Sequence, residues 1–446
     1  MKICVIGLGY IGLPTAAMLA SRGHEVVGFD VNERVVDAIN AGKAHFQEPD
    51  LQMLLTASVE TGKLRARLEP EEADYFIIAV PTPVGAGGVP DMSYVEKATD
   101  AIAPVLKKGS VVILESTSPV GSTERLGAAL AAARPDLRFP RYKDEDSRVD
   151  VAVCHCPERI LPGQMVRELV SNDRIIGGLT RVCAEKARQL YKTFVVGDCF
   201  IAEARVAELV KLSENAYRDV NIAFANELSL ICARLGVDVW HVRELANQHP
   251  RVSILQPGAG VGGHCIAVDP WFLVHSAPEE ARLIRVAREV NDRKPEHVVA
   301  AIRNLAERFK EPVVACYGLT YKPDVDDIRE SPALAIVESV AEIPGAKVLV
   351  CEPNLHELPA SLAGRRNVSL VDADAARQES DIVAILVAHS AFKKTNPDQF
   401  LSKAVVDSVG LFFRPGATTA DDGAGLPGQG FATRSETLSE KRAGGA

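Results

Sequence analysis

The chain has 446 residues, of which 47% are hydrophobic and 24% are charged, and its formal net charge is −9. This composition is typical of a globular enzyme and excludes a disordered, collagen-like or coiled-coil chain. Because a single hydrophobic core rarely grows beyond about 250–300 residues, we expect three structural units. The excess of negative charge argues against a nucleic-acid partner and against an anionic membrane surface.

Cysteine usage and hydropathy indicate a cytoplasmic protein. The nine cysteines are scattered, and only Cys154 and Cys156 lie close together, unlike the dense pattern of a small disulfide-bonded secreted domain. Glycines interrupt the apolar run at the N-terminus before it forms a signal sequence. No apolar stretch approaches the roughly 18 residues of a membrane span, so we expect no membrane partner.

The first 30 residues predict a βαβ unit, with a buried strand, a glycine turn, a helix over Leu13–Ser21 and a strand that ends at Asp30. Further strands are expected over Tyr75–Val80, Val111–Glu115 and Val151–Cys154, and a helix over Tyr94–Leu106. This alternation predicts a parallel doubly wound sheet whose ligand crevice lies at the carboxyl ends of the strands. Residues 7–12, 81–82 and 116–117 should converge there.

A long helix is expected over Ala204–Leu235, because this stretch contains neither Gly nor Pro and its apolar residues recur at intervals of three and four. At 1.5 Å per residue it would be about 45 Å long, more than one small domain needs. We therefore expect it to link two domains and to carry a dimer interface. A second helix is expected over Glu279–Asn291.

A second α/β region is expected after the helices. Its strands are expected over Val313–Tyr317, Val348–Cys351, Ile382–Val387 and Val405–Asp407. It lacks a second GxGxxG pattern, so it need not bind a dinucleotide as the first region does. After Arg414 the chain has too few apolar side chains to form a core, which predicts disorder.

These elements define the expected fold class and domains. We expect an α/β chain in which an N-terminal Rossmann domain and a C-terminal Rossmann-like domain are joined by a central helical domain with one long helix. The expected boundaries are 1–200 for an NAD-binding domain, 201–300 for a helical dimerisation domain, 301–414 for the C-terminal domain and 415–446 for a disordered tail.

The glycine turn is the candidate cofactor site. Gly7, Gly9 and Gly12 form GLGYIG directly between a strand and a helix, where backbone N–H groups and the helix N-terminus favour a pyrophosphate. Asp30 would accept hydrogen bonds from ribose hydroxyls and repel a 2′-phosphate, which favours NAD over NADP, although Arg34 lies nearby. The alternative is a glycine-rich turn in a fold without a dinucleotide.

Cys265 is the candidate nucleophile. It ends the loop PGAGVGGHC, whose four glycines suit close approach by a ligand, and a thiolate can attack an aldehyde. A buried structural cysteine is the equally weighted alternative. His264 and the Cys154-His155-Cys156 triplet do not complete a four-ligand set, so no metal is expected.

Three polar residues have structural interpretations that compete with a role in chemistry. Asp269 precedes Pro270 and is explained by an N-cap followed by a proline at the first helical position. Lys211 and Asn215 lie four residues apart on the long helix and therefore share a face, which could enter a site or be solvated. Periodicity alone favours the solvated face.

The motifs taken together resemble the UDP-glucose/GDP-mannose dehydrogenase family over residues 1 to about 414. They read VIGLGYIGLPTAA, AVPTP, ESTSPVGST, CPERILPGQ, KLSENAYRDVNIAFANELSLIC, HPRVSILQPGAGVGGHCIAVDPW, AREVND and YKPDVDDIRESPA. The resemblance implies an NAD-binding domain, a helical dimerising centre and a C-terminal domain that binds a nucleotide sugar. The CPERILPG segment resembles the N-acetylhexosamine branch, whereas the Cys154/Cys156 pair and the tail have no role in the resemblance.

The resemblance also implies the chemistry, a four-electron oxidation of a C6 alcohol to a carboxylate with two NAD. Cys265 would capture the aldehyde as a thiohemiacetal, and the resulting thioester would be hydrolysed. The implied substrate is UDP-N-acetyl-D-mannosamine for bacterial surface polysaccharide synthesis, with UDP-GlcNAc, UDP-GalNAc and UDP-glucose as alternatives. Lys211 would transfer protons, Asn215 would stabilise an oxyanion and Asp269 would position water, while Lys211, Asp269 and Glu158 remain alternative bases.

By the same resemblance, further residues bind the two ligands. Those implied for NAD are Gly7, Gly9, Tyr10, Ile11, Gly12, Asp30, Thr82, Thr117 and Arg329. Those implied for the UDP-sugar are Arg159, Ile160, Lys211, Asn215, Arg218, His249, Arg251, Gly262, Tyr321 and Lys322. The cations among them would supply the local positive charge that an acidic protein needs to hold a diphosphate.

Two other functions compete with this interpretation. A two-electron hydroxyacid or sugar-phosphate dehydrogenase also joins a Rossmann domain to a long-helix domain, and it would yield one NADH per substrate. A redox sensor that binds NAD without catalysis would use Cys265 as its switch.

Overall fold

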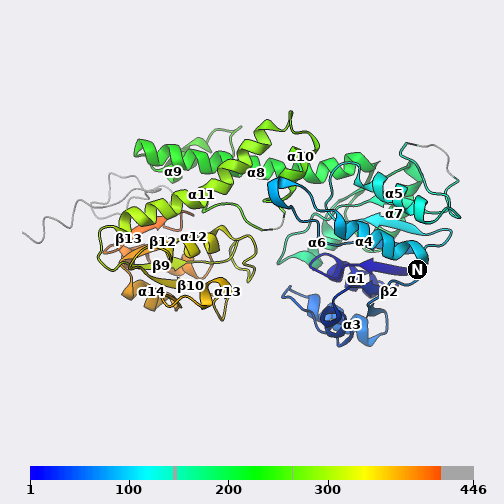
Figure 1. Cartoon of the computed structure of the whole chain (residues 1–446), viewed down its shortest axis with the longest axis horizontal. Coiled ribbons are helices and arrows are strands. Elements are labelled where there is room, and N and C mark those ends of the chain that lie inside the picture. Colours follow the sequence, from blue (N-terminus) through cyan, green and yellow to red (C-terminus); the bar gives the residue numbers. More distant parts are fainter. Residues whose placement is uncertain (144–147, 264, 413–446) are drawn as a thin grey trace, which may run out of the picture. The chain divides into compact units, whose positions relative to one another are not determined.

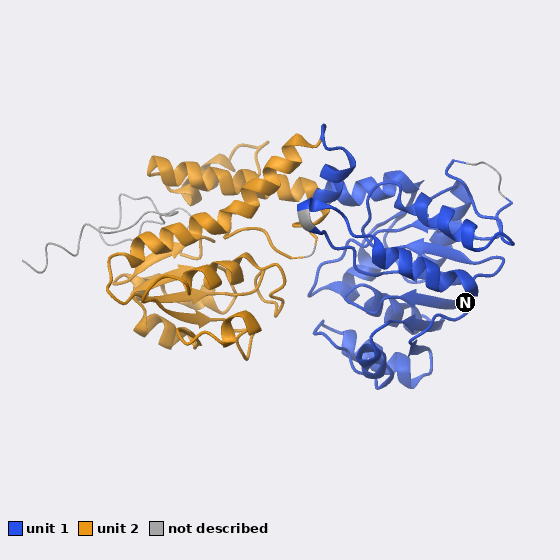
Figure 2. Ribbon diagram, in the orientation of Figure 1, with its two compact units in different colours: residues 1–214, 271–280 blue, residues 215–270, 281–446 orange. Residues whose placement is uncertain are grey.

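The computed structural model describes residues 1–143, 148–263 and 265–412 and divides into two compact units. Unit 1 comprises residues 1–214 and 271–280, and unit 2 comprises residues 215–270 and the described part of 281–446 (Figure 2). Each unit contains one sheet.

Unit 1 is built on an eight-stranded sheet in the order β3-β2-β1-β4-β5-β6-β7-β8 (Figure 1). The strands are β1 (Lys2–Ile6), β2 (Glu25–Phe29), β3 (Leu64–Arg67), β4 (Tyr75–Ile78), β5 (Val111–Leu114), β6 (Ala152–His155), β7 (Arg174–Gly178) and β8 (Cys199–Glu203). The helices are α1 (Gly12–Ser21), α2 (Glu33–Asn40), α3 (Leu51–Glu60), α4 (Ser93–Ile102), α5 (Ser122–Ala133), α6 (Met165–Ser171) and α7 (Arg181–Tyr191). Strands β1 to β6 are parallel, as expected of a doubly wound sheet.

The sheet differs from the predicted parallel sheet at the end formed by β7 and β8. Strand β7 pairs antiparallel with β6, with Cys154 opposite Gly178, and β8 continues parallel to β7. Strands β3, β7 and β8 are absent from the predicted elements, because their sequences mix charged residues and glycines with short apolar runs. The predicted helix over Tyr94–Leu106 ends at Ile102 and continues as a 3-10 turn, Ala103–Val105, which contains Pro104.

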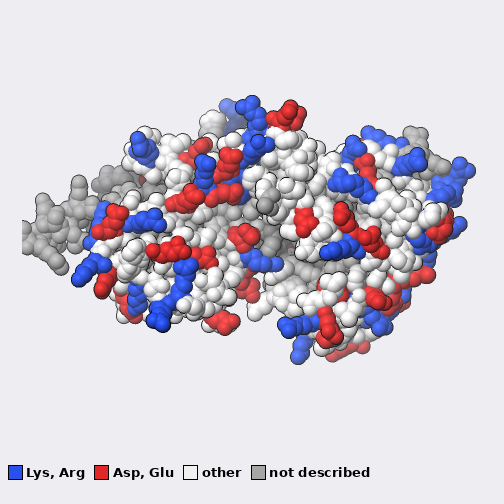
Figure 3. Space-filling model, viewed as in Figure 1, with Lys and Arg blue, Asp and Glu red and all other residues white. Residues whose placement is uncertain are grey.

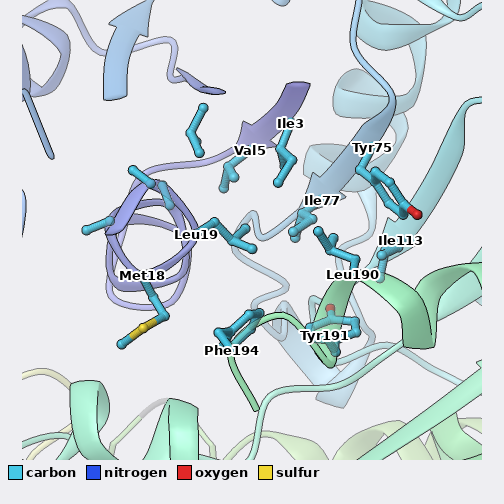
Figure 4. Packing of buried hydrophobic residues seen from close by; sticks show 14 of the residues in the cluster. Ile3, Val5, Met18, Leu19, Tyr75, Ile77, Ile113, Leu190, Tyr191 and Phe194 are labelled. Atoms are coloured by element: carbon cyan, nitrogen blue, oxygen red, sulfur yellow. The ribbon is translucent and has the colours of Figure 1, made fainter. Parts of the chain in front are cut away.

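Both faces of the first sheet are buried, which explains its apolar strands. Ile3 and Val5 pack with Leu19 of α1 on one face, where Leu190 and Tyr191 of α7 complete the cluster (Figure 4). Cys4 and Ile6, which alternate with them, pack on the other face against α4 and α5.

Helix α8 (Ala204–Leu235) has the predicted bounds. At its start, the Glu208 carboxylate accepts hydrogen bonds from the backbone nitrogens of Gly121 and Thr123, at 2.6 and 2.8 Å. This carboxylate therefore caps the N-terminus of α5, where negative charge is favourable. Helices α9 (Val239–Ala246), α10 (Asp269–Ser276) and α11 (Arg282–Ala306) follow.

Helix α11 is longer than the predicted Glu279–Asn291 segment and contains Pro295 in its interior. Beyond the proline, Val298, Ile302 and Leu305 are buried against the second sheet. This packing extends the helix, since the proline removes only one hydrogen bond of the ladder. The helix runs across position 300, where the sequence places a boundary, so the boundaries of the three domains stay a prediction.

Unit 2 contains a five-stranded parallel sheet in the order β11-β10-β9-β12-β13. The strands are β9 (Val313–Tyr317), β10 (Lys347–Cys351), β11 (Val368–Leu370), β12 (Ile382–Ile385) and β13 (Ala404–Asp407). The helices are α12 (Pro332–Val340), α13 (Ala360–Ala363) and α14 (Ala373–Glu379). The predicted disordered tail, 415–446, lies outside the described residues. None of the described helices has both the length and the apolar character needed to cross a membrane.

Candidate active site

The glycine turn after β1 has the shape that a dinucleotide requires. Gly7 has a φ of +87°, and a Cβ on Gly12 would lie 1.8 Å from the Gly7 carbonyl oxygen, so both positions exclude a side chain. Gly9 differs, because a Cβ there would meet no protein atom within 4 Å. Packing within the described residues therefore does not explain Gly9, whereas close approach of a pyrophosphate does, and the turn fits the cofactor that its sequence predicts.

Asp30 lies at the end of β2 beside this turn. Its carboxylate accepts hydrogen bonds from the backbone nitrogens of Leu8 and Asn32, each at 2.9 Å. These bonds hold the carboxylate next to the turn, where the ribose of a dinucleotide is expected. Tyr10, within the turn, stacks on Phe46 with ring centroids 4.3 Å apart, and Ile11 precedes the first residue of α1.

Thr82 and Thr117 follow the carboxyl ends of the neighbouring strands β4 and β5. The Ser116 hydroxyl donates to the Val80 carbonyl oxygen at 2.7 Å and thereby joins the two strand ends. The structure thus brings both threonines to the same edge of the first sheet as the glycine turn.

Glu158 is held by a buried guanidinium. Nη1 of Arg174 donates to its Oε2 at 2.5 Å and lies 3.6 Å from Oε1 of Glu115, and all three side chains are buried. The guanidinium also lies over the Tyr191 ring, 5.2 Å from its centroid. Burial, followed by repulsion from Glu158, raises the pKa of Glu115 to about 8.

The segment that carries Arg159 and Ile160 is anchored on both sides. Arg159 forms an ion pair with Glu214 at 2.7 Å. The buried Glu48 carboxylate accepts hydrogen bonds from the backbone nitrogens of Gly163 and Met165, both at 2.7 Å. Ile160, between these anchors, is half-buried.

Lys211 and Asn215 both lie on a buried face of α8, with 9% and 7% of their surface exposed. The solvated helix face that periodicity favours is therefore wrong for these two residues. His155, at the end of β6, is also buried, and burial lowers its pKa to about 3, so its ring is neutral.

Asn215, Asp269 and Cys265 are linked by hydrogen bonds within unit 2. Nδ2 of Asn215 donates to Oδ2 of the buried Asp269 at 2.5 Å. The backbone nitrogens of Val268 and Asp269 donate to the Cys265 carbonyl oxygen, so Cys265 begins the turn that leads into α10. Cys265 itself is exposed, which excludes the buried structural cysteine. The predicted N-cap at Asp269 is shifted, because α10 already begins at this residue.

The glycine loop before Cys265 packs closely on the segment 321–332 of the same unit. A Cβ on Gly262 would lie 2.2 Å from the Glu330 carbonyl oxygen, and one on Gly263 would lie 2.8 Å from the Tyr321 ring. Asn226 of α8 holds the beginning of this loop, because its Oδ1 accepts from the backbone nitrogen of Gly258 at 2.9 Å. Tyr321 is thus placed beside the loop that leads to Cys265.

The remaining predicted residues lie on the surface of unit 2. Arg218 is an exposed residue of α8, and His249 and Arg251 occupy an exposed turn after α9. Arg329 forms an ion pair with Asp327 at 2.8 Å, and Lys322 follows Tyr321 in the chain. The assignment of these residues to ligands stays a prediction.

Sequence reasoning missed Glu48, Glu115 and Arg174. Each is a buried charged residue, whereas charged side chains are usually exposed, and its partners lie far away in the chain. Cys154 and Cys156 are buried in the core of unit 1, which explains the pair without chemistry. Among the described residues, no group of three or more His, Cys, Asp or Glu side chains is arranged to hold a metal ion.

The first sheet and its glycine turn define a dinucleotide-binding α/β protein. Three models of one dehydrogenase family match successive parts of the chain. They describe the UDP-glucose/GDP-mannose dehydrogenase NAD binding domain over residues 1–195, the central domain over 205–293 and the UDP binding domain over 315–413. The chain therefore belongs to the UDP-glucose/GDP-mannose dehydrogenase family and is an NAD-dependent nucleotide-sugar dehydrogenase.

Relatives cover almost the whole chain. An NDP-N-acetyl-D-galactosaminuronic acid dehydrogenase of Ralstonia nicotianae is 58% identical over 92% of this chain and 96% of its own length. A UDP-N-acetyl-D-mannosamine dehydrogenase of Campylobacter jejuni is 56% identical over 90% of this chain and 98% of its own length. The solved structure of the UDP-N-acetyl-mannosamine dehydrogenase of Staphylococcus aureus has a TM-score of 0.81 and 42% identity, over 92% of this chain and 94% of that one.

Proposed function

We propose that this chain oxidises the C6 alcohol of UDP-N-acetyl-D-mannosamine to the carboxylate, with Cys265 as the nucleophile. The observation that carries the proposal is the exposed Cys265 in the turn that also places Asp269, whose carboxylate accepts from Asn215 at 2.5 Å. A nucleophile, an amide donor and a carboxylate are the parts that acyl chemistry needs. The relative from C. jejuni supports the substrate.

The reaction removes four electrons in two steps. NAD, when bound, supplies the oxidant by accepting one hydride in each step. The Cys265 thiol adds to the aldehyde that the first step forms, and the second oxidation converts this thiohemiacetal into a thioester. Water then cleaves the thioester, which releases the carboxylate and restores the thiol.

Four polar side chains can assist these steps: Asn215, Asp269, Lys211 and Glu158. The bond to Asp269 fixes the direction of the Asn215 amide, whose nitrogen has a second hydrogen that can donate to a developing oxyanion. Asp269 can in turn accept a proton from water. Lys211 and Glu158 remain the other candidate bases, and Glu158 is held by Arg174 at 2.5 Å.

UDP-N-acetyl-D-galactosamine is the second candidate substrate. The relative from R. nicotianae, named for a galactosaminuronic acid, is 58% identical to this chain. A substrate panel of UDP-N-acetyl-hexosamine epimers and UDP-glucose, followed by NADH absorbance, distinguishes the two candidates by their kcat/KM values. A uronate activated by UDP is a glycosyl donor, so we also propose a role in surface polysaccharide synthesis.

The protein would act as a cytoplasmic homodimer. No disulfide joins any of the nine cysteines, all of which lie among the described residues, and this supports a reducing compartment. Tyr217, Phe224 and Ile231 lie on α8 at intervals of seven residues and are 70%, 54% and 48% exposed. Apolar side chains repeated along one helix face support a partner helix at this place.

Replacing the thiol tests the mechanism. We expect Cys265→Ser to lose acid formation by on the order of a thousandfold or more while NAD binding is retained, because an alcohol is a far weaker nucleophile for the aldehyde. Cys199→Ser, which changes a half-buried cysteine of β8, is the matched control and should retain wild-type turnover.

The stoichiometry separates the competing functions. The proposal requires two NADH per sugar oxidised, measured by absorbance against product quantified by mass spectrometry. One NADH per sugar with accumulated aldehyde would indicate a two-electron dehydrogenase. Wild-type turnover in Cys265→Ser would contradict the thioester route, and NAD binding without turnover on any sugar would indicate a redox sensor.

A further inference from the structure

The two sheets of the protein repeat one arrangement at the end of their first strand. Gly7 follows β1 with a φ of +87° and donates to the Phe29 carbonyl oxygen at 2.8 Å. Gly318 follows β9 with a φ of +96° and donates to the Cys351 carbonyl oxygen at 2.9 Å. In each case the glycine crosses to the end of the neighbouring strand, β2 or β10.

The repetition extends to the carboxylate that follows the neighbouring strand. The backbone nitrogen of Leu8 donates to Oδ2 of Asp30 at 2.9 Å, and the backbone nitrogen of Leu319 donates to Oε2 of Glu352 at 2.7 Å. The other oxygen of each carboxylate accepts from the residue two positions later, Asn32 or Asn354. Glu352 is therefore the structural counterpart of Asp30.

The two carboxylates nevertheless have different surroundings. Glu352 is only 5% exposed, and the buried His389 lies against it, with 3.0 Å between Nε2 and Oε2. No helix begins in the turn after Gly318, since the next one, α12, begins at Pro332. In unit 2 the histidine thus contacts the carboxylate oxygen that also accepts from Leu319, and the loop has no helix N-terminus for a pyrophosphate.

The hydrogen bonds around His389 determine which ring nitrogen carries the hydrogen. The backbone N–H of Asp324 donates to Nδ1 at 3.0 Å, so Nδ1 is an acceptor and carries no hydrogen. The hydrogen of the neutral ring is therefore on Nε2, which donates to the Glu352 carboxylate. The Asn354 amide, 3.0 Å from Nδ1, adds a second donor on the same side of the ring.

Together the two side chains hold both ends of the loop 319–324. Glu352 accepts the backbone N–H groups of Leu319 and Thr320, and His389 accepts that of Asp324, which has a φ of +60°. The next residue, Ser390, binds the Asp324 carboxylate through its backbone nitrogen and its hydroxyl, at 2.8 and 2.6 Å. Tyr321 and Lys322 lie between the two ends.

We propose that Glu352 and His389 are positioning residues that set the loop 319–324 for the nucleotide sugar. The inference rests on the proposed function, because it takes Tyr321 and Lys322 as contacts of the UDP-sugar. The first unit uses its carboxylate beside a cofactor turn, whereas the second uses the equivalent carboxylate to hold a substrate loop. Both side chains are buried, with Glu352 5% and His389 0% exposed, so their replacement should act through the loop on binding and leave the chemical step largely intact.

Replacing the histidine tests this role. We expect His389→Leu to raise the KM for the UDP-sugar about tenfold, with kcat within about threefold of wild type and an unchanged KM for NAD, because the loop alone is released. Exchange of the Leu319, Thr320 and Asp324 amide hydrogens should become faster. His389→Asn, whose Oδ1 can still accept from Asp324, should restore most of the binding.

Two further variants control for general loss of structure. Asn367→Ala removes two hydrogen bonds to the backbone of the same unit, at 2.8 and 3.0 Å, and should leave the KM for the UDP-sugar unchanged. Ser390→Ala removes one exposed hydrogen bond to Asp324 and should raise this KM by about twofold to fivefold, even if His389→Leu fails to fold.

The outcomes separate the positioning role from the proposed function. An unchanged KM in both His389→Leu and Ser390→Ala would overturn the positioning role alone, provided that the wild type oxidises a UDP-sugar. Faster exchange throughout residues 313–407 in His389→Leu, without rescue by His389→Asn, would also overturn it. A wild-type protein that binds no UDP-sugar in calorimetry would overturn the proposed function itself.

Discussion

Glu115 is a residue whose charge is set by its neighbours. It shares the Arg174 guanidinium with Glu158, but it lies 3.6 Å from the shared nitrogen whereas Glu158 lies 2.5 Å from it. One guanidinium compensates one buried carboxylate, so the second carboxyl group retains its proton more strongly. The pKa of Glu115, raised to about 8 by burial first and by Glu158 second, assigns that proton to Glu115.

This assignment predicts a pH dependence of stability. Between its ordinary pKa of 4.5 and its folded value of about 8, Glu115 is protonated in the folded chain and ionised in the unfolded chain. The unfolded state then binds fewer protons, so the free energy of unfolding falls as the pH rises through this window, by at most about 1.4 kcal/mol per pH unit. In Glu115→Gln, which carries no charge at any pH, we expect this contribution to disappear.

Urea unfolding of both proteins at several pH values between about 5 and 9 measures the difference. The stability of Glu115→Gln relative to wild type should rise with pH and become constant above about pH 8. Glu69→Gln, at an exposed position, is the control and should follow the wild-type curve. Parallel curves for Glu115→Gln and wild type would contradict the assignment of the proton.

In the turn between β1 and α1, packing constrains one glycine and leaves another open to a ligand. A Cβ at Gly12 would lie 1.8 Å from the Gly7 carbonyl oxygen, whereas one at Gly9 would meet no protein atom within 4 Å. The same substitution should therefore have different consequences at two positions of one turn.

We expect Gly12→Ala to lower the free energy of unfolding by about 1–3 kcal/mol, because the turn must open to admit the methyl group. Gly9→Ala should leave the melting temperature within about two degrees of wild type and weaken NAD binding at least tenfold. Thermal unfolding and NAD titration by fluorescence measure the two effects. Full NAD affinity in Gly9→Ala would show that the cofactor does not approach this glycine.

Elements with a strong local signal could be predicted from the sequence. The GLGYIG turn and helix α8, which has the predicted bounds, can be recognised from residues that are neighbours in the chain. Helix α11 could not be delimited in this way, because its second half is stabilised by Val298, Ile302 and Leu305 packing on the second sheet across Pro295. Strands β7 and β8 likewise depend on pairing with partners distant in the chain, β6 with β7 and β7 with β8.

In the candidate site, too, residues recognisable from the local sequence differ from residues whose partners are distant in the chain. The loop sequence predicts Cys265 as a candidate nucleophile, whereas the role of Asp269, four residues later, is implied by the family resemblance. Arg174 and Glu352 are side chains whose function depends on partners from distant strands, and a buried arginine is contrary to its usual exposure. Tertiary contacts therefore decide which charged residues of the site are positioning groups.

At the scale of the whole molecule, the formal charge of −9 does not gather into one field on the face that Figure 3 shows. Lysine and arginine side chains alternate with aspartate and glutamate side chains over both units. The face in view therefore offers no extended attraction to a polyanion, and a diphosphate bound there would depend on individual cations at short range.

The exposed apolar face of α8 has a different character. Tyr217 and Phe224 expose 70% and 54% of their surface, and Ile231 and Leu235 continue the row. All four lie in unit 2. A second copy of the chain, related by a twofold axis, would present the same row and could cover it.

Charges placed in this row should separate the proposed dimer. Each buried aromatic side chain contributes about 1.5–3 kcal/mol, and the pair Tyr217→Lys and Phe224→Lys changes two such side chains in both copies. We expect the dissociation constant of the double variant to rise at least about a hundredfold, measured by sedimentation velocity over a range of protein concentrations. Met53→Lys, at a 72% exposed residue of α3 outside the row, should leave the dimer intact. A double variant that sediments as wild type at every concentration would place the interface elsewhere, whereas a monomer with wild-type melting temperature would assign it to α8.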